Sequence, residues 1–395
     1  MALACVMTAV GVAPVAAAEA PATFVRLADP SDPAVDASSL VAIPAVGVHS
    51  ATVAAFVHGL DPAADVSLPP DDGGPILVRT TSTAAVRLAG EIAESELFDA
   101  VDYDIRRTAS DAGYTAAPDD PLFRDPTYGW GLKPAPGTAL AAVWPTLDRA
   151  TPGTEVPIAV IDSGFLASHV DMAPWVVPKW DYGESDPDIV PRGPQVSYHG
   201  SYVASVIGAM PNNGIGGTGA GWDTPVWCYK VTDSAGVMRD GVIAQAIDGA
   251  MRDGAKVINL SMGGPQYSAA MEAAIARAIA AGVVVVAAAG QSDGEPDTPA
   301  NRTAMHYPAS YPAVLSVAAI RPDGSAMPSG YYNDLVDIAA PGTEVGILIE
   351  GDSVGYGAGT SFAAPHAAAA AALLRRHRMD LDPAAIVAAL VDAAR

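Results

Sequence analysis

Residues 359–366 have the sequence Gly-Thr-Ser-Phe-Ala-Ala-Pro-His, and an alanine-rich segment follows them from residue 367 to residue 374. We expect a helix there, with Ser361 among the unpaired backbone N–H groups and the positive dipole end of its N-terminus. That position suits a nucleophile whose reaction leaves negative charge on a neighbouring oxygen. Pro365 is compatible with the first helical turn, where a missing N–H costs little. Taken alone, this stretch is better explained by a serine that caps a core helix.

The part of the chain before this serine alternates between apolar and helical segments. The apolar segments cover residues 156–161, 226–231, 256–260 and 283–289, and helical spacing is found at 241–252 and 269–281. This alternation predicts an α/β fold with a parallel sheet that is flanked by helices on both faces. In such sheets, functional residues gather at the carboxyl ends of the strands.

Two titratable residues occupy positions of this kind. Asp162 ends the first apolar segment, and Gly164 permits the sharp turn that leaves its carboxylate above the sheet. His199 opens a segment with small residues at helical intervals. Taken alone, Asp162 would be interpreted as a turn or helix-cap residue, and His199 would be interpreted as a surface residue. With Ser361 they follow the chain order Asp, His, Ser, which is one of the known orders of a catalytic triad.

In these three motifs the chain resembles the subtilisin-like serine endopeptidases, or subtilases, over roughly residues 120–395. The resemblance implies that Ser361 attacks the scissile carbonyl, that His199 transfers the proton, and that Asp162 orients the imidazole. It also implies protein or peptide substrates and no cofactor for the chemistry itself.

The resemblance extends to the substrate cleft. Ser261, Met262 and Gly263 match the strand with which the family pairs an extended peptide through main-chain hydrogen bonds. With Ala289 and Gly290 they are expected to line the pocket for the side chain that precedes the scissile bond. An open, apolar pocket implies broad specificity that leans towards hydrophobic side chains. An ordinary core strand is compatible with the same residues.

One residue of the cleft departs from the family pattern. Gln291 follows Ala289 and Gly290, where the family has the asparagine that donates a hydrogen bond to the oxyanion. Glutamine carries the same carboxamide on a longer stem, so Gln291 and the backbone N–H of Ser361 are the candidate oxyanion-hole donors. The alternative is a solvated loop residue with no role.

Residues 211–217 resemble the calcium-binding loop of the family, and Asp171 matches the carboxylate that joins it. Calcium takes hard oxygen ligands, so Asp171 and Asn213 are the candidate side-chain ligands. An Asn-Gly turn beside a surface aspartate explains the same residues equally well. The other histidines show no ligand spacing and are interpreted as structural or surface residues: His49, His58, His169, His306, His366 and His377.

The N-terminal part of the chain is expected to contain segments that are not part of the enzyme domain. Residues 1–20 are typical of a signal peptide, although a basic start is missing, and 21–74 are rich in Pro, Asp and Ala. Residues 75–117 resemble the small, ferredoxin-like α+β propeptides that inhibit such enzymes, and residues 118–395 would form the catalytic domain. We therefore expect a secreted, extracellular zymogen that cleaves itself between Arg107 and Pro118 and that its own propeptide inhibits.

Composition excludes several other classes of protein. The chain has 395 residues, 21 basic against 44 acidic, and a formal net charge of −23. Without a basic cluster, binding to nucleic acids or anionic membranes is not expected, and no segment predicts a membrane span. Two rivals remain: a catalytically impaired subtilase fold that serves in binding, and a doubly wound nucleotide-binding enzyme. The second requires a glycine fingerprint after the first strand, which residues 162–165 do not supply.

Overall fold

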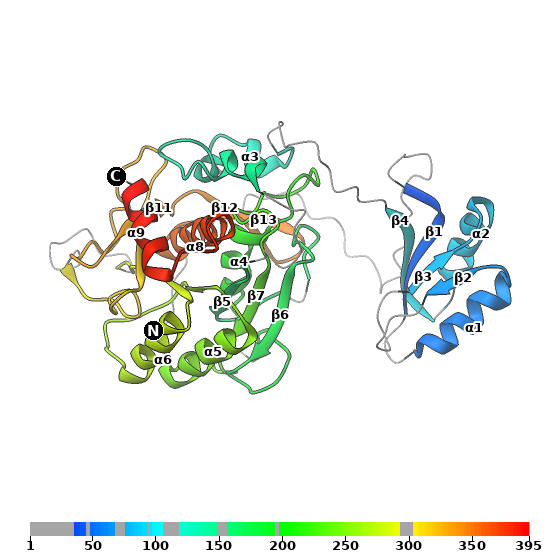
Figure 1. Ribbon diagram of the computed structural model, residues 1–395, viewed down its shortest axis with the longest axis horizontal. Coiled ribbons are helices and arrows are strands. Elements are labelled where there is room, and N and C mark those ends of the chain that lie inside the picture. Colours follow the sequence, from blue (N-terminus) through cyan, green and yellow to red (C-terminus); the bar gives the residue numbers. More distant parts are fainter. Residues whose placement is uncertain are drawn as a thin grey trace. The chain divides into compact units, whose positions relative to one another are not determined.

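The computed structural model describes ten stretches of the chain, which fall into two compact units. These stretches are residues 35–44, 48–67, 76–93, 95, 97–105, 118–147, 156–166, 168–193, 197–292 and 303–394. The predicted signal peptide and the predicted cleavage window between Arg107 and Pro118 lie outside the described residues. Each unit is described below by itself (Figure 1).

The C-terminal unit is built on one sheet of seven strands, with the order β11-β10-β9-β8-β5-β7-β6. All six neighbouring pairs are parallel, as the alternation of apolar and helical segments predicts. The strands are β5 (Ile158–Asp162), β6 (Val176–Asp181), β7 (Val226–Lys230), β8 (Val257–Leu260), β9 (Val284–Ala288), β10 (Leu315–Ile320) and β11 (Ile338–Pro341). The chain passes from β7 to β8 across β5, so the carboxyl end of β5 lies at the point where the strand order reverses. Crevices that bind ligands form at such points.

Alternate residues of β5 explain why both faces of the sheet are covered. Ile158 and Val160 belong to one hydrophobic cluster, whereas Ala159 and Ile161 belong to another, and all four are fully buried. Successive side chains of a strand point to opposite faces, so a strand with no polar alternation needs a cover on each side. The predicted fold class is therefore confirmed.

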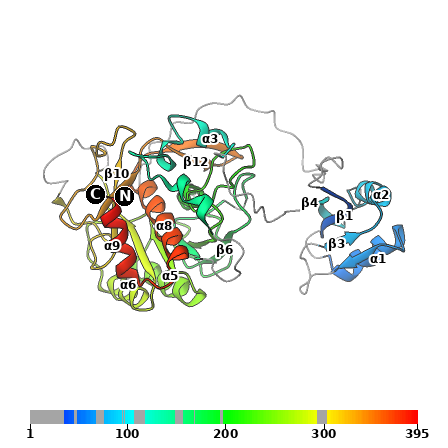
Figure 2. The same ribbon diagram turned by 45° about the horizontal axis from the view of Figure 1, so that its top comes forward.

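Helices provide the cover on each face (Figures 1 and 2). One face packs against α5 (Asp240–Asp253) and α6 (Ala269–Ala280). The other packs against α4 (His199–Gly208), α8 (Thr360–His377) and α9 (Pro383–Ala393). α8 is the long central helix, and its alanines allow close packing on the strands beneath it.

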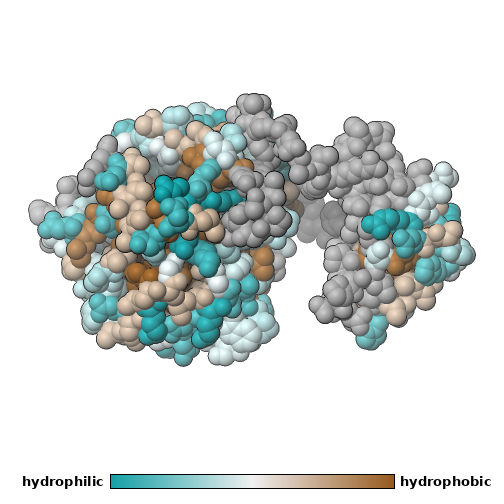
Figure 3. Space-filling model, in the orientation of Figure 1, coloured by the Kyte–Doolittle hydropathy of each residue, from teal (hydrophilic) through white to brown (hydrophobic). Residues whose placement is uncertain are grey.

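Smaller elements surround this framework. They are α3 (Pro121–Arg124), the 3-10 turns η1 (Trp130–Leu132), η2 (Leu140–Ala142) and η3 (Trp144–Thr146), and the antiparallel hairpin of β12 (Val345–Ile349) and β13 (Ser353–Gly357). Hydrophilic and hydrophobic residues are intermixed on the face of this unit that Figure 3 shows. Within the described stretches, no helix combines the length and the apolar character that crossing a membrane requires.

The N-terminal unit is a four-stranded antiparallel sheet with two helices. Its elements are β1 (Val35–Pro44), α1 (Ser50–Leu60), β2 (Asp65–Ser67), β3 (Ile76–Arg79), α2 (Ser82–Ala93) and β4 (Phe98–Ile105), and its strand order is β2-β3-β1-β4. That chain order and that strand order are those of a ferredoxin-like fold. The strand-helix-strand pattern expected after residue 75 is present as β3, α2 and β4.

The boundary predicted at residue 75 is nevertheless too late. β1 lies inside the sheet, where it pairs with both β3 and β4, so residues within the predicted 21–74 region are part of the folded unit. β1 lacks the strict alternation that marks a strand locally. It is stabilised by partners that are distant in sequence, which a local pattern does not reveal.

Candidate active site

Three elements of the C-terminal unit bring the predicted triad to one edge of the sheet. Asp162 is the last residue of β5, His199 is the first of α4, and Ser361 is the second of α8. Nδ1 of His199 donates a hydrogen bond of 2.8 Å to Oδ1 of Asp162. The imidazole lies 5.9 Å, between ring centroids, from the ring of Phe362, the residue after Ser361. The hydrogen-bonded imidazole and carboxylate are therefore adjacent to the start of α8.

Burial and charge act on the imidazole in opposite directions. Asp162 is fully buried and His199 is 8% exposed. Burial alone would lower the pKa of His199, but the charge and the hydrogen bond of Asp162 outweigh it and raise that pKa above the ordinary value of 6.5. Nε2 of His199 and Oδ2 of Asp162 are buried, and neither atom forms a hydrogen bond with the described part of the chain. Nε2 is thus available to a partner.

The structure corrects the place of Pro365. α8 begins at Thr360, so Pro365 lies in the second turn of the helix and not in the first. A proline there removes the N–H that would bond to the carbonyl of Ser361, four residues earlier. Ser261 replaces that bond, because its hydroxyl donates to the Ser361 carbonyl oxygen at 2.8 Å. In return, the hydroxyl of Ser361 donates to the carbonyl of Ser261 at 3.2 Å.

Gln291 lies against the first residues of α8. Its Oε1 accepts a hydrogen bond of 2.7 Å from the backbone N–H of Thr360, one residue before Ser361. Gly359 makes this contact possible: it has a φ of 148°, and a Cβ added there would come within 3.0 Å of both Oε1 and Nε2 of Gln291. Because Oε1 accepts this hydrogen bond, the amide nitrogen Nε2 is the end of the side chain that can donate to another group. Nε2 makes no hydrogen bond to any residue that the structure describes.

The predicted substrate-binding residues extend two adjacent strands beyond the sheet. Ser261, Met262 and Gly263 follow β8, and Ala289 and Gly290 follow β9, its parallel neighbour. The backbones of Met262 and Gly263 make no backbone hydrogen bond to the described residues, whereas the next residue, Gly264, pairs with Tyr307. Within the described residues, this short stretch of backbone near Ser361 is therefore left without a pairing partner.

The sequence indicated that His306 is a structural or surface residue, but the structure places it against the residues that were expected to line the substrate pocket. A Cβ added at Gly263 would lie 2.5 Å from Nε2 of His306, and one added at Gly290 would lie 2.5 Å from its Cγ. The imidazole thus contacts both of the glycines that were expected to line the pocket. No local motif marks His306, because the contact joins residues that are distant in sequence.

The loop predicted to bind calcium surrounds two carboxylates. Asp171, one of the predicted ligands, accepts hydrogen bonds from the Asn213 amide at 2.8 Å and from the Gly217 N–H at 2.7 Å. Asp120, which the sequence did not single out, is fully buried and accepts from the N–H groups of Asn213 and Gly214 at 3.0 and 3.2 Å. Burial, followed by the nearby charge of Asp120, raises the pKa of Asp171 to about 7, against the opposing effect of its hydrogen bonds.

The residues of this loop carry the kind of oxygen atoms that calcium prefers as ligands, but the Asn213 amide is not oriented to bind an ion. Asp171 supplies a hard carboxylate oxygen, but both oxygens of Asp120 already accept hydrogen bonds, from the backbone N–H groups of Asn212, Asn213 and Gly214 and from the Thr218 hydroxyl. Asn213 presents its amide nitrogen to Asp171, so a cation there requires the amide to turn its oxygen inward. Among the described residues, no group of three or more His, Cys, Asp or Glu side chains gathers in a metal-binding arrangement.

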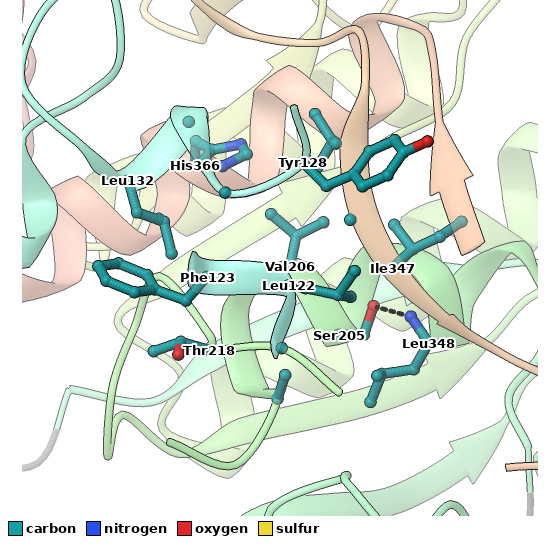
Figure 4. A pocket seen from close by; sticks show the side chains of 16 residues that line it. Leu122, Phe123, Tyr128, Leu132, Ser205, Val206, Thr218, Ile347, Leu348 and His366 are labelled. Atoms are coloured by element: carbon teal, nitrogen blue, oxygen red, sulfur yellow. Dashed lines mark hydrogen bonds between the residues drawn. The ribbon is translucent and has the colours of Figure 1, made fainter. Parts of the chain in front are cut away.

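Residues of α3 and of α8 help to line one pocket (Figure 4). Leu122 and Phe123 line it together with Ser205 of α4 and His366 of α8. The hydroxyl of Ser205 accepts from the N–H of Leu348 at 3.1 Å and so joins α4 to β12. Burial lowers the pKa of His366 to about 4, and its imidazole is therefore a neutral packing group.

Comparisons with known proteins agree with this geometry. The profile of the subtilase family matches residues 153–395. Subtilisin NAT from Bacillus subtilis subsp. natto is 34% identical over 222 residues, which make up 56% of this chain and 56% of the relative. Thermitase from Thermoactinomyces vulgaris is 32% identical over 258 residues, or 65% of this chain and 85% of thermitase. A protease structure from Pseudoalteromonas arctica aligns with a TM-score of 0.61 and 27% identity, over 71% of this chain and 93% of that one.

The fold and the family match therefore define an α/β protein of the subtilisin-like class. In particular, the chain belongs to the subtilase family, because the family profile covers more than half of its length. The match spans only about half the length of subtilisin NAT.

The pKa of His199 gives the first test of the site. We expect the imidazole to titrate above 6.5 in a Ser361→Ala background, and below 6.5 when Asp162→Asn is added, because burial then acts without a compensating charge. NMR titration of the histidine ring measures both values. An equal or higher pKa in the Asp162→Asn protein would contradict the assignment of Asp162 as the charge that sets it.

Proposed function

We propose that this protein is a serine endopeptidase, and the observation that carries the proposal is the hydrogen bond between buried His199 and Asp162 at the head of α8. Ser361 is the nucleophile. Rotation about its Cα–Cβ bond turns the hydroxyl from the Ser261 carbonyl towards the free Nε2 of His199. His199 then takes the proton and later delivers it to the leaving amine, while Asp162 stabilises the imidazolium.

The oxyanion is held by the backbone N–H of Ser361 and by the amide nitrogen of Gln291. Thr360 supports this role because it fixes Oε1 of Gln291 and leaves Nε2 as the donor. The longer stem of glutamine is accommodated because Gly359 has no side chain. A preorganised donor of this kind stabilises the charge that develops in the transition state.

The substrate is an extended peptide that adds to the unpaired backbone of Met262 and Gly263. A hollow of about 260 Å³ lies beside the same edge, with Met238, Met262 and Met271 in its lining. Thioether side chains adapt to apolar partners, which supports broad cleavage with a preference for hydrophobic residues along the peptide.

The N-terminal ferredoxin-like unit acts as an inhibitory propeptide of a secreted zymogen. Support comes from its fold and from its position ahead of the peptidase unit in the chain. Cleavage between Arg107 and Pro118 would release the active enzyme. The alternative to an active peptidase is a catalytically impaired subtilase fold that only binds peptides.

Ser361→Ala separates these alternatives. Casein hydrolysis and labelling by a fluorophosphonate probe are expected in the wild type and absent in the variant, with kcat lower by about 10⁶. Intact-mass measurement should find the wild type cut between Arg107 and Pro118 and the variant uncut. A wild-type protein that neither reacts with the probe nor hydrolyses casein would favour the impaired fold.

Gln291→Glu tests the oxyanion donor without removing the contact to α8. Glutamate keeps an acceptor for the Thr360 N–H but lacks the N–H₂ group, so we expect an unchanged melting temperature and a kcat lower by about 10²–10³. Gln291→Asn, which keeps the donor on a shorter stem, is the matched control. Equal kcat in the glutamate variant and the wild type would leave Gln291 without a catalytic role.

The proposal also includes a structural calcium ion, with Asp171 and Asn213 as side-chain ligands. In a Ser361→Ala background, calcium should raise the melting temperature, as expected for a ligand that stabilises by about 2.7 kcal/mol at a hundredfold excess over its Kd. Asp171→Asn should abolish the increase, whereas Asp334→Asn, an exposed control with the same charge change, should not. Equal melting temperatures with calcium and with EDTA would argue against the ion.

A further inference from the structure

We infer that His306 sets the size limit of the pocket that receives the side chain before the scissile bond, and that the enzyme prefers a small residue there. The inference rests on the proposed peptidase function and narrows its specificity. It concerns this position of the substrate only, and it leaves the apolar preference at other positions unchanged.

The imidazole occupies the space above two glycines. A Cβ added at Gly263 would lie 2.5 Å from Nε2 and 2.7 Å from Cδ2 of His306. A Cβ added at Gly290 would lie 2.5 Å from Cγ and 2.6 Å from Cδ2. One ring therefore contacts the ends of both strand extensions that form the pocket walls. Without that ring, two adjacent glycine walls would leave an open slot.

Hydrogen bonds hold the backbone that carries the ring, and the ring itself lies beside Tyr331. The backbone N–H of His306 donates to the Ser310 hydroxyl at 3.0 Å, and the next residue, Tyr307, pairs with Gly264 through two hydrogen bonds of 2.8 and 2.9 Å. The ring of Tyr331 lies 5.5 Å from the imidazole, between centroids. A bound peptide would therefore meet the imidazole at this position.

His306 acts through its bulk rather than through a positive charge. Burial lowers its pKa to about 4, so the imidazole is neutral wherever His199 is neutral enough to serve as a base. No charged side chain appears among the groups that shift this pKa. A neutral ring over two glycines leaves room for glycine, alanine or serine and excludes aromatic and long aliphatic side chains.

The test compares two peptide substrates that differ only in the residue before the scissile bond, alanine or phenylalanine. Wild-type processed enzyme should favour alanine in kcat/KM. His306→Gly should raise kcat/KM for the phenylalanine peptide by about 10–200-fold, the range for adding apolar volume to a pocket, and change the alanine value little. His306→Phe keeps the bulk and should retain the wild-type preference.

The control is His377→Ala, on an exposed residue about 24 Å from Ser361 along the axis of α8, and it should match the wild type on both peptides. If wild type prefers phenylalanine, or if His306→Gly hydrolyses both peptides with the wild-type ratio, the inference is overturned while the peptidase function stands. If wild-type enzyme cleaves neither peptide and no casein, the proposed function fails and the inference fails with it. Melting temperatures identify any variant that is unfolded, and His306→Ala then replaces His306→Gly.

Discussion

The hydrogen bond between His199 and Asp162 is the interaction on which the rest of the site depends. It joins the end of the inner strand β5 to the first residue of α4, at the point where the strand order reverses. Burying a carboxylate beside an imidazole is costly unless the two groups stabilise each other. Here the carboxylate outweighs the effect of burial and keeps the imidazole basic enough to accept a proton.

Ser361, the proposed nucleophile, is positioned by the extensions of two strands as well as by its own helix. Pro365 leaves the Ser361 carbonyl without a helical partner, and Ser261 donates to it from the end of β8. Gln291, at the end of β9, accepts from the Thr360 N–H one residue earlier. The start of α8 is thus hydrogen-bonded to the same two strand extensions that line the proposed substrate pocket, so the same residues support both the proposed nucleophile and the proposed substrate site.

Much of this arrangement was predictable. Continuous apolar strands that alternate with helices indicate a covered parallel sheet, and the order of Asp162, His199 and Ser361 indicates a triad because each residue follows a recognisable local pattern. The start of the N-terminal unit at β1 was not predictable, since that strand is stabilised by β3 and β4 across the sheet. Asp120 was not predicted for the same reason, because its hydrogen-bond partners lie in a loop about ninety residues further along the chain.

The sequence by itself determined the class of sheet, the three candidate triad residues and the departure at Gln291, because these depend on periodicity and on short motifs. Only the tertiary structure decided what surrounds them. It turned Oε1 of Gln291 to the Thr360 N–H, placed Pro365 in the second turn of α8, and set the ring of His306 over Gly263 and Gly290. These outcomes depend on close packing between segments that are far apart in the chain, and such packing has no local signature.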